Sequence, residues 1–333
     1  MESLKERARL VLKSIKETHA VGYYGISCLD DFLHGIYKDD LVIITAQSGA
    51  GKTEIAFNLA YNNARNKKVL LYALEADTYE PDKRFLYKII YELYLKDNQK
   101  KYQTFSYRNY VHNKLDIEKY FDKAINIFAE SQKPDIVYYD TEFTIDSFKQ
   151  SLLSTKTDYD LIVLDHLDYF DVEENVTENQ QMGNIMKELR ILNQKFKKPV
   201  IAVSHLRKGA RKTLMPTIDD LMGSSNKAKI ATTVITLAPD KENYAMDGMY
   251  PTYFSVQKSR LGTSGNMLMK QVFNSNKNSY EMDYMLMSYN QYEDKAEILT
   301  EDKYPKWYKS KDITPWYKQG SSEIFEAEDK VPW

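Results

Sequence analysis

A glycine-rich segment at residues 46–53 restricts the possible folds more than any other part of the sequence. It follows a strand-like apolar run, residues 41–45, and leads into a segment of helical periodicity, residues 53–65. The order Ala-Gln-Ser-Gly-Ala-Gly-Lys-Thr is that of a Walker A loop, with Ala46 where the first glycine usually stands. The alternative is a chance glycine-rich turn, but the strand before it and the complete Gly-Lys-Thr ending favour a phosphate-binding loop.

The residue types in this loop match the chemistry of phosphate binding. Small residues let the backbone approach phosphate oxygens, and here they are Ser48, Gly49, Ala50 and Gly51. The N-terminus of the following helix adds a positive dipole. We expect Lys52 to reach the β- and γ-phosphates of bound ATP and the Thr53 hydroxyl to bind Mg²⁺.

Two acidic residues that end strand-like runs complete this predicted site. Asp165 follows four apolar residues, a Walker B pattern, and is expected to hold Mg²⁺ through water. Glu75 ends the run at residues 69–74 and is expected to activate the attacking water. The alternatives are a turn-capping aspartate and a solvated glutamate, and the role of Asp168 stays open.

Strand-like runs alternate with helical segments through the middle of the chain. The runs are residues 41–45, 69–74, 136–140, 161–165, 200–204 and 232–237. Short apolar strands separated by helices predict a parallel sheet that is covered on both faces. After Pro239, runs at residues 252–257, 267–273 and 280–287 predict an antiparallel extension.

These patterns divide the chain into three parts: an amphipathic N-terminal helix within residues 1–20, a body at 21–290 and a tail at 291–333. The tail carries ten acidic and seven basic side chains and all three tryptophans. Its aromatic groups, residues 304–308 and 314–317, are expected to pack over the body as anchors.

Composition excludes several classes of protein. The 333 residues are 43% hydrophobic and 28% charged with a net charge of −2, which is typical of a globular protein. No apolar run approaches the roughly 18 residues that a membrane span needs, and the charged start does not resemble a signal peptide. The single Cys28 excludes a disulfide framework, and no Cys/His cluster has zinc-site spacing. We therefore expect a cytoplasmic protein, in a bacterium or a phage-infected host, without a membrane partner.

Further motifs resemble one family. They are residues 25–30 before the Walker A loop, Leu74-Glu75 followed by Arg84, residues 199–205, residues 220–225 and residues 258–260. In order and spacing the chain resembles the ATPase domain of DnaB-type hexameric replicative helicases, with His205 closer to the phage and mitochondrial branch. The resemblance implies a RecA-like P-loop NTPase core: an α/β fold with a mostly parallel sheet, an antiparallel extension and helices on both faces.

The resemblance also implies that ATP binds between subunits of a homo-oligomeric ring, expected to be a hexamer. Arg260 would be an arginine finger in the neighbour's site, Lys258 a helper at the γ-phosphate, and His205 a γ-phosphate sensor. The N-terminal helix would pack on an adjacent subunit. The alternatives are a solvated basic strand end, a strand-end histidine in a structural role and a helix folded on its own body.

A basic segment directly after His205 points to DNA. Its cations are Arg207, Lys208, Arg211 and Lys212. In a ring, this basic loop (residues 207–212) would line the channel and contact single-stranded DNA through its phosphates. A solvated basic loop is the alternative.

The sequence leaves three functions open. The first is an ATP-driven, ring-forming DNA helicase of replication, whose acidic tail tip, residues 326–333, docks a polymerase, a primase or a single-strand-binding protein. The second is a RecA-like recombinase or another DNA-remodelling ring ATPase. The third is a helicase loader or regulator with a vestigial nucleotide site.

Overall fold

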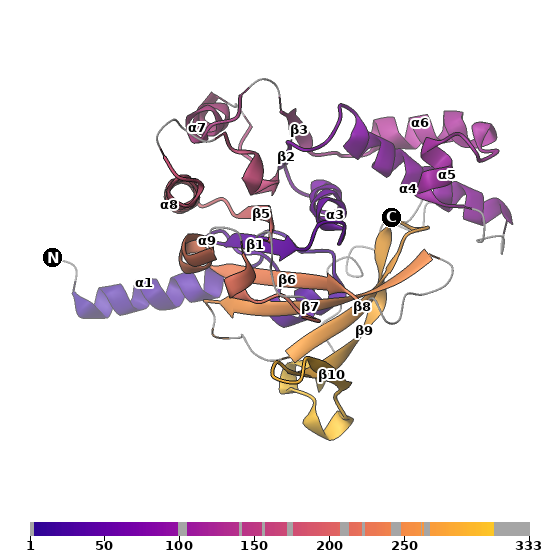
Figure 1. Ribbon diagram of the computed structural model, residues 1–333. Helices are drawn as coiled ribbons and strands as arrows, with labels where there is room; N and C mark the ends of the chain where they lie inside the picture. Colours follow the sequence, from indigo (N-terminus) through magenta and orange to yellow (C-terminus); the bar gives the residue numbers. More distant parts are fainter. Residues whose placement is uncertain are drawn as a thin grey trace.

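The computed structural model describes residues 3–98, 105–139, 142–154, 157–171, 176–206, 213–221, 224–240, 248–260, 262 and 267–309. Within these ranges a ten-stranded sheet has the order β10-β9-β8-β7-β6-β1-β5-β4-β2-β3 (Figure 1). The strands are β1 (Leu41–Ala46), β2 (Val69–Ala73), β3 (Asp135–Tyr138), β4 (Leu161–Asp165), β5 (Val200–His205), β6 (Thr233–Pro239), β7 (Met249–Ser259), β8 (Met267–Asn274), β9 (Ser279–Asn290) and β10 (Lys295–Ile298).

The α-helices alternate with the first six strands, as predicted. They are α1 (Leu4–Glu17), α2 (Ser27–Leu33), α3 (Lys52–Ala64), α4 (Glu80–Asn98), α5 (Tyr107–Val111), α6 (Phe121–Glu130), α7 (Ile145–Ser154), α8 (Glu178–Phe196), α9 (Ser224–Ile230) and α10 (Lys306–Lys309). Short 3₁₀ turns lie between them, including η2 (Leu167–Tyr169) directly after β4.

The six strands from β6 to β3 in the sheet are all parallel, which confirms the predicted parallel core. Their carboxyl ends therefore lie at one edge of the sheet, called here the carboxyl edge. Their starts lie at the opposite, amino edge. β5 is inserted between β1 and β4, so residues far apart in the sequence become neighbours at the carboxyl edge.

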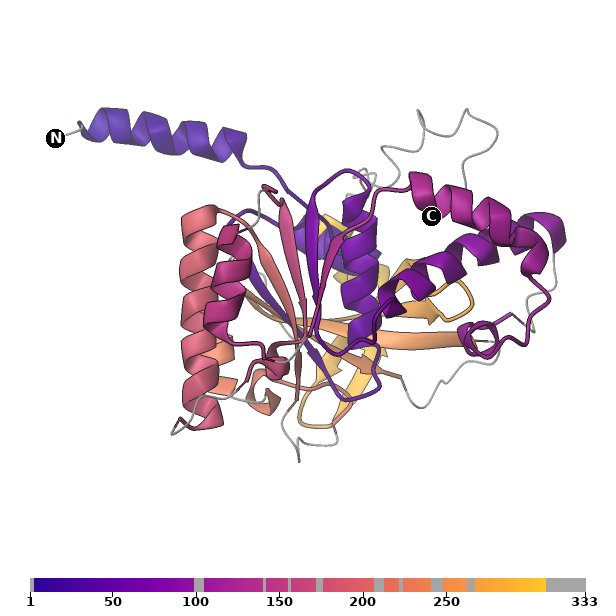
Figure 2. The ribbon, with the colours of Figure 1, turned by 90° about the horizontal axis from the view of Figure 1, so that it is seen from above.

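Alternate side chains of the strands enter two separate cores. In β1, Val42 and Ile44 belong to the core that includes residues of α3, whereas Leu41 and Ile43 belong to the core that includes residues of α8. Figure 2 shows α3 on one side of the sheet and α7 and α8 on the other. Burial on both faces explains why these strands are continuous apolar runs in the sequence.

The antiparallel part, β7 to β10, extends the sheet past its parallel core. Because β10 pairs with β9, the sheet continues beyond residue 290, where the body was expected to end. Trp307 then contacts Phe32 edge to face with ring centroids 5.2 Å apart, and the Tyr308 hydroxyl donates to the Tyr284 carbonyl. The aromatic group at 304–308 thus packs on the body as predicted, whereas 314–317 and the acidic tip lie outside the described residues.

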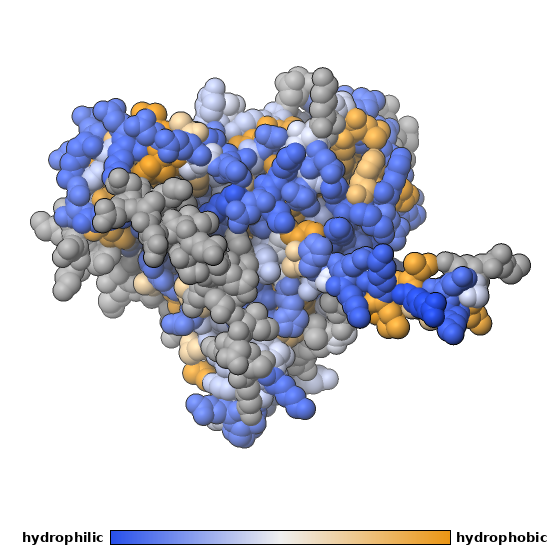
Figure 3. Space-filling view, turned by 180° about the vertical axis from the view of Figure 1, so that it is seen from behind, coloured by the Kyte–Doolittle hydropathy of each residue, from blue (hydrophilic) through white to orange (hydrophobic). Residues whose placement is uncertain are grey.

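Helix α1 projects from the body (Figures 1 and 2). A capping box between Ser3 and Glu6 starts the helix, and none of its residues is buried. Its apolar side chains, more than half exposed, are Leu4, Leu10, Val11, Leu12 and Ile15. Figure 3 shows hydrophobic and hydrophilic residues side by side on this exposed arm. The alternative of a helix folded on its own body does not occur in this structure.

Among the described residues, no helix is both long enough and apolar enough to cross a membrane.

Candidate nucleotide-binding and catalytic site

The loop between β1 and α3 has the backbone geometry of a phosphate cradle. Gly49 and Gly51 have φ of 77° and 87°, in the left-handed region that favours glycine. A Cβ atom built on either glycine would meet nothing within 4 Å, so the space in front of both is open. Because α3 starts at Lys52, its free N–H groups lie at this opening, where phosphate oxygens are favoured.

Lys52 is folded back onto this loop. Its Nζ donates to the carbonyl oxygens of Ala46, 3.1 Å away, and Gln47, 3.0 Å away. Burial lowers the pKa of Lys52, while the carboxylates of Glu75, Asp165 and Asp168 act in the opposite direction. The ammonium group therefore lies among the acidic residues of the site and within the loop that is to receive phosphate.

Asp165 ends β4 and is fully buried. Neither of its carboxylate oxygens has a hydrogen-bond partner of good geometry among the described residues. Burial raises its pKa to about 6, opposed by His166, by the Thr53 hydroxyl and by Lys52. Two unpaired carboxylate oxygens beside a threonine hydroxyl are the hard oxygen donors that Mg²⁺ prefers, so the residues present fit this ion.

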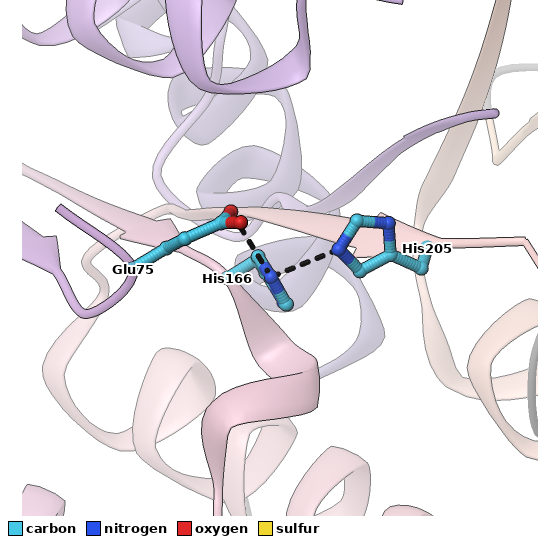
Figure 4. A group of neighbouring side chains, drawn as sticks. All are labelled: Glu75, His166 and His205. Atoms are coloured by element: carbon cyan, nitrogen blue, oxygen red, sulfur yellow. Dashed lines mark hydrogen bonds and ion pairs between the residues drawn. The ribbon is translucent and has the colours of Figure 1, made fainter. Parts of the chain in front are cut away.

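Glu75 lies just beyond β2, directly after Leu74, whose backbone N–H donates to the Asp165 carbonyl of β4. The carboxylate of Glu75 is 3.3 Å from Nε2 of His166, which in turn is 3.0 Å from Nε2 of His205. Figure 4 shows the three side chains converging from the ends of three strands. Burial lowers the pKa of His205, and the nearby cation Lys52 lowers it further. The predicted catalytic glutamate and the predicted sensor are thus joined through His166.

Asp168, on η2, lies behind these histidines, and its side chain is 9% exposed. Its carboxylate accepts from the His205 backbone N–H at 2.7 Å and pairs with Lys227 Nζ at 2.8 Å. It also lies 3.4 Å from His166 Nδ1. Although burial acts to raise the pKa of Asp168, these hydrogen bonds and the Lys227 charge hold it well below its usual value. Lys227 of α9 is fully buried, so this ion pair ties α9 to the end of β5.

Lys258 and Arg260 lie at the amino edge, opposite the phosphate-binding loop. The end of β7 pairs with the start of β6, and the Arg260 N–H donates to the Thr232 carbonyl. The Arg260 side chain is exposed. Neither basic residue belongs to the phosphate site of its own chain.

Lys258 makes hydrogen bonds within its own chain that the sequence did not indicate. Its Nζ donates to the carbonyl oxygens of Ala228, Lys229 and Ala231, at 2.5, 3.0 and 2.7 Å. These carbonyls belong to the last turn of α9 and the residue after it, so Lys258 caps this helix end. A role at a neighbour's γ-phosphate would require these bonds to break.

The basic loop lies outside the described residues, so its cations Arg207, Lys208, Arg211 and Lys212 have no structural account here. The chain enters it from His205 at the carboxyl edge, and Leu206 forms a bridge with Leu221. The entry to the loop is therefore fixed next to the candidate catalytic residues, whereas beyond the loop the Leu214 N–H donates to the Asp294 carboxylate, in the antiparallel part of the sheet.

Sequence reasoning missed His166 and Lys227 and left Asp168 open. His166 could have been noticed because it directly follows the strand-end Asp165. Its closeness to His205 depends on β4 and β5 being neighbours, which no local pattern reveals. Nothing in the sequence marks Lys227 as buried.

A cavity of about 340 Å³ lies elsewhere, between α3, α4 and the β8–β9 turn, with Arg65 and Lys88 in its lining. It contains none of the predicted site residues. We assign the candidate site to the carboxyl edge instead, because the open glycine loop and the converging acidic and imidazole groups are there.

Comparisons with known proteins identify the family of this chain. The sequence profile described as "DnaB-like helicase C terminal domain" matches residues 23–282. A "Probable replicative DNA helicase" of Trieres chinensis is 24% identical over 290 residues, covering 83% of this chain and 60% of the relative. A "Replicative DNA helicase DnaB" of Mycoplasma pneumoniae is 25% identical over 283 residues, covering 78% of this chain and 55% of the relative. The chain thus spans little more than half the length of these curated relatives.

A solved structure supports the fold. The structure titled "The Structure Of A DnaB-Like Replicative Helicase And Its Interactions With Primase" superposes with a TM-score of 0.68 at 19% identity. The superposition covers 84% of this chain and 68% of that chain. It confirms the RecA-like P-loop NTPase fold that the motifs implied.

Proposed function

The chain belongs to the family of DnaB-like helicase C-terminal domains, and from this we propose that it is an ATP-dependent DNA helicase that moves along single-stranded DNA as a ring during replication. The observation that carries this proposal is the division of the candidate ATP machinery between two edges of one sheet. Lys52, Asp165 and Glu75 lie at the carboxyl edge, whereas the exposed Arg260 lies at the amino edge. A chain built this way completes an ATP site only together with another copy.

At the carboxyl edge, each residue has a defined part in ATP hydrolysis. The open loop binds the phosphates through its backbone, and Lys52 exchanges its bonds to the loop carbonyls for bonds to the β- and γ-phosphates. Thr53 and Asp165 would hold Mg²⁺, which supplies positive charge to the phosphates when bound. Glu75 orients the attacking water and accepts its proton, and His205 senses the γ-phosphate through the network it shares with His166.

Arg260 would act in the neighbour's site as an arginine finger. The planar guanidinium neutralises charge that develops on the transferred phosphoryl group. The exposure of its side chain is consistent with this use, and the alternative is a solvated strand end. Lys258 is a weaker candidate for a trans role, because all three of its donors serve the end of α9.

Helix α1 supports assembly into a ring, for which we propose six subunits. An exposed apolar stripe on a projecting helix is stabilised when it is buried against another surface. The neighbouring copy is the partner that the division of the ATP site already requires. Each subunit would then contribute its basic loop to a central channel, where four cations per chain bind the DNA backbone without sequence preference.

The acidic tip of the tail, residues 326–333, is proposed to dock a replication partner such as a polymerase, a primase or a single-strand-binding protein. Its acidic side chains Glu326, Glu328 and Asp329, followed by Pro-Trp at residues 332–333, support an exposed docking peptide. Deleting residues 323–333 should leave ATP hydrolysis intact and abolish partner binding in a pull-down. Unchanged capture of all three partners would refute this role.

The rival functions are separated by an unwinding assay on a duplex with a single-stranded tail. A helicase requires that ATP and Mg²⁺ drive strand displacement, and that a Lys52→Ala variant displaces nothing. ATP-dependent strand exchange without unwinding would instead identify a recombinase. Nucleotide binding without DNA-stimulated hydrolysis would identify a loader or regulator.

A further inference from the structure

Three metal-ligating side chains meet at the carboxyl edge. Their ligand atoms, a carboxylate oxygen of Glu75 and ring nitrogens of His166 and His205, all lie within 4.8 Å of one another. They come from the ends of β2, β4 and β5, which are adjacent in the sheet (Figure 4). We propose that these three residues bind a zinc-class divalent transition-metal ion, and that this ion blocks ATP hydrolysis. The inhibitory part rests on the proposed function of Glu75, whereas the site itself does not.

The spacing of the ligand atoms fits a tetrahedral ion. Zinc bonds of about 2.0–2.2 Å place neighbouring ligand atoms roughly 3.3–3.5 Å apart in a tetrahedron. Glu75 Oε2 is 3.3 Å from His166 Nε2, and the two Nε2 atoms of the histidines are 3.0 Å apart. Two of the three edges are therefore close to the required length before any ion binds. Only the Glu75 to His205 separation, bounded by 4.8 Å, has to adjust.

The donor set selects the class of ion. Two imidazole nitrogens and one carboxylate suit Zn²⁺, Co²⁺ or Ni²⁺, whereas Mg²⁺ and Ca²⁺ prefer oxygen ligands. The site is therefore chemically distinct from the proposed Mg²⁺ site of Thr53 and Asp165. With three protein ligands, it leaves one coordination position open toward solvent or substrate.

The residues behind the ligands hold His166 in place. His166 is 4% exposed, and its ring contacts Tyr169 edge to face. On the side of the ring away from the proposed ion, Nδ1 lies 3.2 Å from the Asp168 backbone nitrogen and 3.4 Å from Asp168 Oδ2. Polar contacts behind a ligating histidine fix the orientation of its ring. Asp168 is itself fixed by the buried Lys227 and by the His205 backbone.

Occupation of this site would remove a catalytic group. A carboxylate of Glu75 that is bound to a metal ion can no longer accept a proton from the attacking water. His205 would be held at the same time, away from its role as γ-phosphate sensor. The ion thus acts as an inhibitor, released when a chelator or a competing cellular ligand removes it.

The test is calorimetric titration of the full chain with ZnCl₂ in Mg²⁺-containing buffer without nucleotide. We expect one ion per wild-type chain, and affinity at least about 100-fold weaker in His166→Asn and in His205→Asn, since even loss of a supporting residue costs 10–100-fold. His112→Asn is the matched control, because His112 is exposed and outside the cluster. Should the His166→Asn variant, changed at a buried position, fail to fold, the zinc affinity of the His205→Asn variant decides, because His205 is only partly buried. Wild-type affinity in the His205→Asn variant, or no binding by the wild type, would overturn the site.

A second titration follows ATP hydrolysis by the wild type. Turnover should fall over the same range of Zn²⁺ that fills the site and return when EDTA is added followed by excess Mg²⁺. Full turnover with the site occupied would overturn the inhibitory role. If the zinc-free chain shows no ATPase activity in the presence of Mg²⁺, that result counts against the proposed function. The calorimetric titration then still decides whether the zinc site exists.

Discussion

Replacing Arg260 by alanine tests whether each ATP site is shared between two copies. The Arg260 N–H donates to the Thr232 carbonyl and the Thr232 N–H donates to the Leu41 carbonyl, so Arg260 lies level with the start of β1. The phosphate-binding loop follows Ala46 at the other end of this strand. At roughly 3.3 Å per residue these ends are about 17 Å apart, which is too far for Arg260 to reach its own nucleotide. We expect Arg260→Ala to lower kcat by about 10³–10⁵-fold without loss of assembly.

A mixing assay separates action in the neighbouring site from a structural effect. Arg260→Ala and Lys52→Ala should each be inactive alone, but mixed rings contain interfaces with an intact Lys52 and an intact Arg260. With random mixing in equal amounts, about one quarter of the interfaces are of this kind, so turnover should recover toward that fraction. Arg260→Lys, which keeps the charge but loses the planar fork, should stay well below wild type. No recovery in the mixture, or normal turnover in Arg260→Ala, would refute the shared site.

Four further predictions concern separate parts of the chain. Lys52→Ala should abolish ATP hydrolysis, and DNA-stimulated turnover that survives this change would exclude the phosphate-site assignment. Lys227→Met should lower the free energy of unfolding by about 3–5 kcal/mol in urea titrations, because it removes the buried cation that pairs with the Asp168 carboxylate. The exposed control Lys229→Met should change it by less than about 0.5 kcal/mol, and equal effects would contradict the buried pair. Deleting residues 1–20 should preserve the thermal unfolding transition but abolish ring assembly in native mass measurements; rings that persist would rule out α1 as the linking arm. Neutralising the four cations of the basic loop should weaken binding to single-stranded DNA. The slope of log binding constant against log salt concentration should become shallower by about 0.7 for each phosphate that is no longer neutralised. An unchanged slope would exclude the loop as a DNA contact.

The sequence predicted the parts of the fold that depend on local pattern. Apart from the edge strand β3, the strands of the parallel core are buried, so they stand out as apolar runs, and the Walker A and Walker B patterns mark the ends of β1 and β4. The helical period of residues 2–17 correctly predicted α1. It could not tell whether the apolar stripe packs on its own body, because that depends on surfaces that lie far away in the sequence.

The parts that the sequence did not predict depend on the order of the strands. His166 and His205 meet only because β5 lies next to β4, although α8 separates them along the chain. In the sequence, Lys227 is one more cation in a short polar helix, yet it is fully buried against Asp168. The motif around Lys258 predicts a role in phosphate chemistry, while its contacts with the end of α9 are visible only in three dimensions. The sequence thus indicated the residues at the strand ends but not the network that connects them.

The most direct test of the shared ATP site is turnover per chain measured against protein concentration, with the oligomeric state followed by native mass at each point. A shared site predicts that the monomer is nearly inactive and that turnover per chain rises together with the fraction of closed rings, expected to be hexamers. Constant turnover per chain, down to concentrations at which only monomers are present, would contradict it.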